Sequence, residues 1–262
     1  MQWSDEGVVL SVKPHGETAA VAEIFTRAHG RHLGLVHGGR SRRLRPILQT
    51  GNHVDAQWKA RLAEHLGHVS LELRKGYAAQ AMDDPLTLAG LSSLCTLARL
   101  LPERDPHPSL FEITLFVLGF LDEPRVWPAL MVRWEMALLD ELGFGLDLSA
   151  CAATGSRDDL IYVSPKSGRA VSEAAGEPYQ DRLLALPAFL AKGGRPGPGA
   201  ALERKEAAVT DADIAAGLEL TGHFLETRVL GPRGEAMPDA RVRLRELIAR
   251  HARAPKPGAV GH

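Results

Sequence analysis

One stretch of the chain concentrates positive charge and contains no acidic residue. No Asp or Glu occurs between Glu23 and Asp55, and the cations of this interval are Arg27, Arg31, Arg40, Arg42, Arg43 and Arg45, with His29, His32 and His37 among them. A guanidinium group can grip a phosphate through two hydrogen bonds, and each cation that displaces a condensed counterion adds affinity that is independent of base sequence. We therefore predict a phosphate-binding surface made of these six arginines and Lys59. The alternative is a solvated arginine-rich loop that binds nothing.

The net charge of the whole chain hides this local excess. The 262 residues carry a formal net charge of −1, which argues against a nucleic-acid-binding protein when it is taken alone. Residues 1–80 carry +4, residues 81–240 carry −10 and residues 241–262 carry +5. The last basic segment contains Arg241, Arg243, Arg245, Arg250 and Arg253. It is either a second phosphate contact or a basic face that complements the dipole of a terminal helix.

The motifs of the common catalytic sites are missing from the sequence. It contains no H-E-x-x-H, no paired C-x-x-C, no G-x-S-x-G and no G-x-x-x-x-G-K-[ST]. Seven of the eleven histidines fall in the first eighty residues, mostly beside Gly or Arg, as is typical of loops. A hydrolase that uses Cys151 as its nucleophile is the weakest alternative, because the cysteine has no recognisable partner. We expect a protein that is not an enzyme and that needs no metal or cofactor.

Hydrophobic periodicity divides the chain near residue 80. Before that point, apolar residues alternate over residues 8–12, 20–24, 33–35, 54–58 and 69–73, and glycine-containing turns separate these segments. Five short strands of this kind predict a small barrel, either an OB-fold or an SH3-like barrel. We expect Phe25 and Trp58 to lie in its core, so the barrel offers few aromatic side chains for base stacking.

Beyond Ala81 the apolar period becomes helical. Helices are predicted at 85–98, 110–121, 129–142, 182–190, 211–225 and 239–250, and an irregular subdomain with a strand at 160–163 at 146–179. A flexible loop is predicted at 193–199, and a disordered tail is predicted at 254–262. The expected fold is α+β, with a barrel domain at 1–80 and a helical domain at 81–253.

Residues 133–148 carry a more specific pattern. The segment Arg133-Trp134-Glu135 is followed by Leu138-Leu139, Leu142-Gly143-Phe144 and Leu148, and Cys151 comes shortly after. The pattern resembles R-[FW]-E-x-x-L-L-x-x-L-G-[FY]-x-x-x-L of the bacterial recombination mediators of the RecO family. The first residues, Gly7-Val8-Val9-Leu10 and Gly16-Glu17-Thr18, are also similar to the first hairpin of that family. The resemblance implies an OB-fold followed by helices that carry a zinc-ribbon-like insertion.

The insertion departs from the family's zinc-binding pattern. Where zinc-binding members carry two C-x2-C pairs, this chain places Cys151, Thr154, Ser172 and Ala175. One thiolate, two hydroxyls and a methyl group cannot supply the four N or S ligands of a structural zinc site. We therefore expect a degenerate insertion without zinc, held together by the packing of Leu160, Tyr162 and Val171.

The resemblance implies functions that the residues alone do not. It implies binding of single- and double-stranded DNA, annealing of complementary strands and, with RecR, help in loading RecA onto DNA covered by single-stranded DNA-binding protein, with RecF involved at most indirectly. It also implies that the helical domain binds the acidic tail of the single-stranded DNA-binding protein, for which we select Arg125 and Arg133. The alternative, which the sequence supports equally well, is that Arg133 pairs with a nearby acid.

The sequence also predicts where the protein is located. The first residues lack the features of a signal peptide, and the most apolar run, 110–121, is too short to span a bilayer. We expect a cytoplasmic protein that associates with the nucleoid during repair and has no membrane partner. The alternative is a helical interaction scaffold whose barrel binds a protein instead of DNA.

Overall fold

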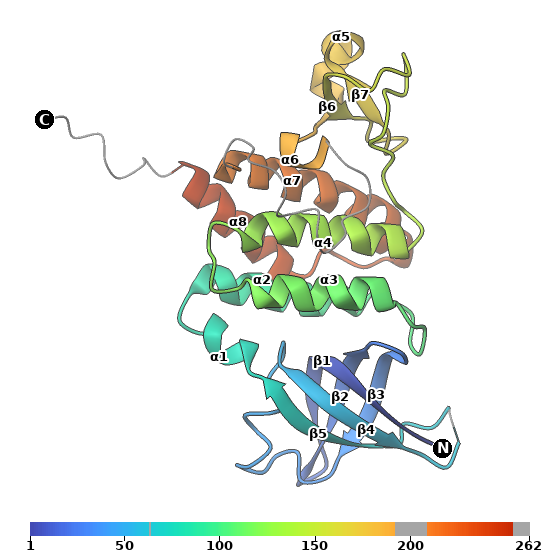
Figure 1. The fold of residues 1–262 in the computed structure, drawn as a ribbon, viewed down its shortest axis with the longest axis vertical. Coiled ribbons are helices and arrows are strands. Elements are labelled where there is room, and N and C mark those ends of the chain that lie inside the picture. Colours follow the sequence, from blue (N-terminus) through green and yellow to red (C-terminus); the bar gives the residue numbers. More distant parts are fainter. Residues whose placement is uncertain (63, 192–208, 254–262) are drawn as a thin grey trace, which may run out of the picture. The chain divides into compact units, whose positions relative to one another are not determined.

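The computed structural model of the protein describes residues 1–62, 64–191 and 209–253. The loop predicted at 193–199 and the tail predicted at 254–262 lie outside these residues. The chain forms two compact units that divide between Leu142 and Gly143, and each unit is described by itself. Figure 1 labels the helices and strands along the chain.

The first unit begins with a closed five-stranded barrel. Its strands are β1 (Gln2–His15), β2 (Ala19–Thr26), β3 (Gly30–Val36), β4 (His53–Lys59) and β5 (His68–Lys75), in the order β1-β2-β3-β5-β4. β1 pairs with β4 in antiparallel fashion, and the parallel pairing of Leu35 with His68 joins β3 to β5. This closure is that of an OB-fold, so the predicted fold class is confirmed and the SH3-like alternative is not.

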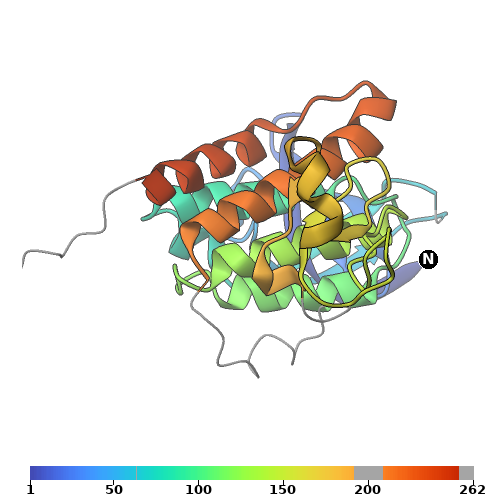
Figure 2. The same ribbon diagram turned by 90° about the horizontal axis from the view of Figure 1, so that it is seen from above.

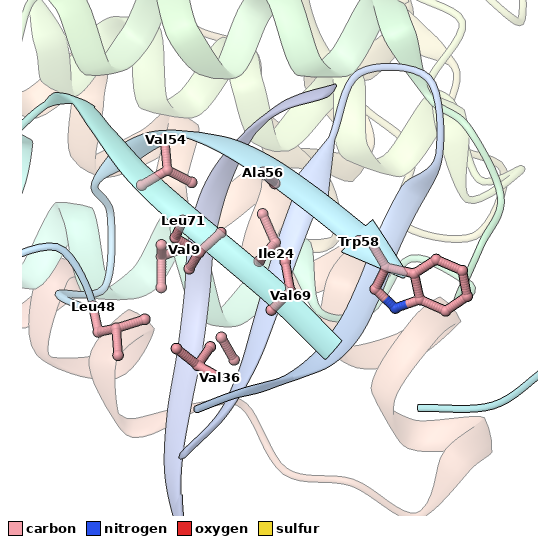
Figure 3. Close-up of a cluster of buried hydrophobic side chains, with 10 residues drawn as sticks. Val9, Ile24, Val36, Leu48, Val54, Ala56, Trp58, Val69 and Leu71 are labelled. Carbon is pink, nitrogen blue, oxygen red and sulfur yellow. The ribbon is translucent and has the colours of Figure 1, made fainter. Parts of the chain in front are cut away.

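Alternating side chains of the strands fill the barrel. Figure 3 shows this core, with Leu48 at one end and Trp58 at the other; its other labelled members are Val9, Ile24, Val36, Val54, Ala56, Val69 and Leu71. Trp58 is 2% exposed and lies in the barrel core, as predicted; Phe25 is also fully buried, but it packs on Phe111 outside this barrel cluster. Gly67 has φ +65° and packs on the Trp58 indole, since an added Cβ would lie 2.6 Å from its ring atoms.

Four helices follow the barrel within the first unit. They are α1 (Tyr77–Ala81), α2 (Pro85–Ala98), α3 (Pro108–Gly119) and α4 (Trp127–Glu141), close to the predicted positions of the last three. Each of α2, α3 and α4 has proline in its first turn, where the missing N–H is not needed. Asp84 caps α2 by accepting a hydrogen bond from the Thr87 amide at 2.8 Å. The Trp134 indole donates to the Thr114 hydroxyl at 2.8 Å and joins α4 to α3 in the buried interior.

A buried carboxylate joins the barrel to these helices. The Glu23 side chain on β2 is 4% exposed and accepts hydrogen bonds from Arg31, from Arg99 at the end of α2 (2.8 Å) and from Ser11 (2.9 Å). Beside it, the Phe25 ring meets the edge of Phe111 on α3, with 5.5 Å between centroids. These contacts explain why the first compact unit extends to Leu142, beyond the barrel boundary predicted near residue 80.

The second unit combines a small sheet with two longer helices. Its described elements are β6 (Leu160–Val163), β7 (Ala170–Ser172), α5 (Glu173–Gly176), η1 (Glu177–Arg182), β8 (Leu184–Ala185), α6 (Ala188–Ala191), α7 (Asp211–Phe224), η2 (Leu225–Leu230), η3 (Gly231–Arg233) and α8 (Asp239–Arg253). The sheet order is β7-β6-β8. Thr210 and Asp213 form a capping box that starts α7. Figures 1 and 2 show α7 and α8 side by side, and the buried Arg241 of α8 donates to the Leu218 carbonyl of α7 at 2.6 Å.

The helix predicted at 182–190 is wrong. Leu184 and Ala185 form the edge strand β8, whose partners on β6 are Val163 and Tyr162. Pro187 then separates this strand from the single turn of α6. The apolar residues of this segment belong to a short edge strand and a helical turn. Pairing with β6 satisfies the backbone N–H and C=O groups that hydrogen bonds within a helix would otherwise satisfy.

The Glu23 carboxylate provides a test of the barrel–helix junction. Burial raises its pKa, but the hydrogen bonds from Arg31, Ser11 and Arg99 outweigh burial and hold the pKa below its ordinary value of 4.5. Its contribution to stability is therefore complete above about pH 4.5 and is lost as the pH falls through the lower pKa of the folded state. We expect Glu23→Gln to reduce the free energy of unfolding by roughly 3 kcal/mol near neutral pH, measured by urea denaturation.

The matched control is Glu112→Gln, because Glu112 pairs with Arg27 while its side chain remains 41% exposed. We expect that variant to lose less than about 1 kcal/mol. The Glu23→Gln protein also loses less stability than the unsubstituted protein between about pH 5 and pH 3, because it lacks the titrating carboxylate. Equal losses for the two variants would contradict the role given to Glu23.

Candidate nucleic-acid interface

The segment between β3 and β4, residues 37–52, forms an ordered platform that we call the arginine loop. Leu48 is 6% exposed and packs on the barrel core together with the half-buried Leu44 and Ile47. The Leu48 amide donates to the Leu44 carbonyl at 2.9 Å, and the Asn52 amide group donates to the Pro46 carbonyl at 2.8 Å. Its apolar residues therefore hold the loop on the barrel, and its charged residues are left on the outside.

Four arginines predicted to bind phosphate lie on the outer side of this loop: Arg40, Arg42, Arg43 and Arg45 are all exposed. Arg40 donates to the carbonyls of Gly16 (3.2 Å) and Glu17 (2.9 Å) and so ties the loop to the turn between β1 and β2. The side chains of the other three make no ion pair with any residue that the structure describes. Their charge is available to an external anion.

Two glycines allow the loop to lie flat on the barrel. Gly38 has φ +62°, a backbone conformation that residues with a side chain rarely adopt. At Gly39 an added Cβ would lie 2.8 Å from the Cβ of Ala20 on β2. The loop backbone therefore contacts the sheet directly, and the arginines that follow are held close to the barrel wall.

A groove of about 860 Å³ runs beside the arginine loop, and we call it the barrel groove. Its lining includes His37 and Arg43 of the loop, Lys59 of β4, and His68 and Glu72 of β5. Arg43 and Lys59 are permanent cations, whereas Glu72 is the one carboxylate among the described lining residues. The structure thus places Arg43 of the loop and Lys59 of β4 in the lining of one groove, and Arg40, Arg42 and Arg45 lie on the loop beside it.

The groove offers no free indole face for base stacking. The Trp3 ring stacks on His29, with ring centroids 4.3 Å apart, and on Trp58, with centroids 5.7 Å apart, and the rings of each pair are nearly parallel. The Trp3 indole is therefore already stacked within the barrel. The polar and cationic groups of the lining favour contacts to the phosphate backbone, which position a nucleic acid without reading its bases.

Arg27 and Arg31 do not line the barrel groove, whereas Arg43 and Lys59 do. Arg27 forms ion pairs with Glu6 (2.6 Å) and with Glu112 of α3. Arg31 pairs with Glu23 and donates to the Leu101 carbonyl at 2.8 Å. Both guanidinium groups serve the junction between barrel and helices, so the candidate interface consists of Arg40, Arg42, Arg43, Arg45 and Lys59.

Two histidines of the groove were not among the residues predicted to bind phosphate. His37 and His68 are exposed and stack with 4.5 Å between ring centroids. Thirty positions separate them in the chain, and the parallel pairing of β3 with β5 brings them together. The signal that could have located them is the OB-fold topology itself, since it places the end of β3 beside the start of β5.

The two residues chosen for a protein partner lie near and on α4. Arg125 is exposed in the turn before the helix, beside the exposed Val126. Arg133 lies on the helix and is half-buried, and it has an interaction partner within the chain. The two arginines therefore differ in their availability to a partner, with Arg125 the more accessible.

The four positions of the degenerate metal site are only partly brought together. The Ser172 amide and hydroxyl both donate to the Cys151 sulfur at 3.3 Å. Burial raises the pKa of this thiol, but hydrogen bonds from Ser172 and Thr154 outweigh burial and lower the pKa to about 6. The described part of the chain holds no cluster of three or more His, Cys, Asp or Glu side chains suited to a metal ion. Hydrogen bonds thus connect positions that metal ligands would occupy.

None of the described helices is long and apolar enough to cross a membrane.

Comparisons with known proteins agree with the fold and the motif. Residues 1–77 match the family described as Recombination protein O N terminal, and residues 82–235 match Recombination protein O C terminal. A DNA repair protein RecO of Methylobacterium nodulans is 57% identical over 241 residues, which cover 92% of this chain and 95% of that protein. A DNA repair protein RecO of Rhodopseudomonas palustris is 51% identical over 259 residues, which cover 97% and 99% of the two chains. The chain therefore belongs to the recombination protein O family of DNA repair proteins.

Proposed function

We propose that this protein is a DNA-binding recombination mediator whose barrel groove and arginine loop hold the phosphate backbone of single- and double-stranded DNA. The observation that carries the proposal is the ordered arginine loop, whose apolar side faces the core while Arg42, Arg43 and Arg45 remain exposed and unpaired within the described structure. Lys59 adds a further cation, which lines the groove together with Arg43. Cations that have no internal ion pair bind a polyanion without the free-energy cost of breaking such a pair.

Annealing of complementary strands follows from the same chemistry. Two DNA strands approach each other only when the repulsion between their backbones is reduced, and phosphate contacts achieve this for any sequence. Bases left free by such contacts remain available for pairing with a second strand. We therefore propose annealing as the activity of this surface, without a catalytic residue.

The protein partners are proposed on the basis of the family. We propose that RecR joins the protein on DNA, that the two help load RecA, and that the acidic tail of the single-stranded DNA-binding protein binds near Arg125 and Arg133. Residues 81–240 carry a net charge of −10 in the sequence, so an acidic tail requires a local basic site. The exposed Arg125 beside the apolar Val126 has the required combination of charge and apolar surface.

The salt dependence of DNA binding tests the role of the arginine loop. We expect replacement of Arg40, Arg42, Arg43 and Arg45 by Gln to weaken binding of a single-stranded oligo(dT). The slope of log affinity against log salt flattens by up to about three, because fewer counterions are released. The measurement is fluorescence anisotropy of the labelled strand between about 50 and 200 mM salt.

Two further variants sharpen that experiment. A triple variant that keeps Arg40 separates phosphate binding from the hydrogen bonds of Arg40 to the β1–β2 turn. The control replaces Arg157 and Arg182, which are exposed arginines of the second unit, and leaves the slope unchanged. An unchanged slope in the loop variants would refute the proposed interface. A wild-type affinity that does not vary with salt would favour a protein ligand for the barrel.

A binding assay with an acidic peptide tests the partner site. We expect Arg125→Ala to weaken binding of an acidic peptide with an apolar carboxyl end by about two- to fivefold, because an exposed ion pair is lost. Arg133→Lys keeps the charge but loses the planar fork of the guanidinium, and we expect a smaller loss, because Arg133 already has a partner within the chain. The control is Arg157→Ala. Unchanged affinity in both test variants would exclude this site.

A further inference from the structure

The barrel groove has two chemically different ends. On the β1–β4–β5 face, one row of paired residues is Gln2, Lys59 and His68, and the next row is Ser4, Gln57 and Ser70. The row beyond these is Glu6, Asp55 and Glu72. Positive charge is therefore found at the end where β5 begins. In the row at the other end, Glu6 and Asp55 pair with Arg74, and Glu72 is the carboxylate that lines the groove. A phosphate is attracted to the first end, and His37 and His68 lie there.

The charges around the two histidines are defined by the groove lining. Arg43 contributes a cation from the arginine loop, Lys59 contributes one from β4, and Glu72 is the carboxylate of β5. From β1 the lining receives Gln2, Trp3 and Ser4, none of which ionises. In the register of β4 with β5, Lys59 is directly opposite His68, whereas Glu72 is four residues further along the strand. The pair thus has cations as its near neighbours.

The stacked rings and the nearby cations place several positive or protonatable groups close together. The ring centroids are 4.5 Å apart, so two imidazolium rings would repel each other, and Arg43 and Lys59 would add to that repulsion. An anion in the groove removes much of this cost. Imidazoles ordinarily exchange protons around pH 6 to 7, so the effect falls in the range in which proteins work.

We propose that the stacked His37–His68 pair is a proton-linked phosphate contact, so that DNA binding in the barrel groove takes up protons and becomes tighter as the pH falls. The inference rests on the proposed DNA-binding function and adds to it two binding residues and a pH dependence. Arg42, Arg43, Arg45 and Lys59 supply charge that does not change over this range, whereas the histidines supply charge that appears when phosphate is present.

The test compares DNA affinity at two pH values. For the unsubstituted protein and a single-stranded oligo(dT), we expect about fivefold tighter binding near pH 6 than near pH 8, because one linked proton changes affinity by up to about tenfold per pH unit. His37→Gln combined with His68→Gln reduces this ratio to less than about twofold. Titration calorimetry in two buffers of different ionisation enthalpy gives the number of protons taken up, which the double variant loses.

A matched control uses histidines outside the groove. His15 and His65 are exposed on the same barrel and do not line the groove, so His15→Gln with His65→Gln keeps the full pH dependence. All four imidazoles are exposed, and the substitutions leave the barrel core intact.

The outcomes distinguish the two proposals. Salt-sensitive DNA binding with the same pH ratio in the His37/His68 variant would overturn the proton-linked contact and leave the DNA-binding function standing. A loss of the pH ratio in the His15/His65 control as well would also overturn it. Failure of the unsubstituted protein to bind DNA at either pH would overturn the proposed function itself, and with it this inference.

Discussion

The parallel pairing of β3 with β5 closes the barrel and determines where its binding surface lies. The Leu35 amide donates to the Gly67 carbonyl at 3.0 Å, and Leu35 is paired with His68. This pairing brings the start of the arginine loop beside the start of β5, which creates one wall of the barrel groove. A slip of one residue would move every side chain of a strand to the opposite face, so the closure also fixes which residues face the groove.

Neighbouring carboxylates determine whether each arginine forms an ion pair within the protein or stays exposed. Arg27 meets Glu6 and Glu112, and Arg31 meets Glu23, so these two arginines stabilise the contact of the barrel with α2 and α3. Arg42, Arg43 and Arg45 of the loop form no such ion pair among the described residues, and the apolar anchors of the loop hold them on its exposed side. A contiguous basic run in the sequence thus separates into a structural pair and an exposed set.

The sequence predicted the local structure well and the long-range contacts poorly. Period-two alternation located all five barrel strands, and the helical period located α2, α3, α4, α7 and α8, because these patterns reflect burial on one face. It left the type of barrel open, since strand spacing contains no information on closure. The helix predicted at 182–190 was wrong, because Leu184 and Ala185 pair with β6. The sequence also could not show that Arg27 is ion-paired or that His37 stacks on another histidine. The partners are Glu112 and His68, which are distant in the chain.

Mapping the DNA on the protein tests the central claim most directly. A single strand that carries a photoreactive nucleotide is cross-linked to the full chain, and the attached peptides are identified by mass spectrometry. We expect the cross-links in residues 37–45, 57–59 and 68–72, which border the barrel groove. Cross-links concentrated in the second unit, with the arginine loop unlabelled, would contradict the assignment of DNA binding to the barrel.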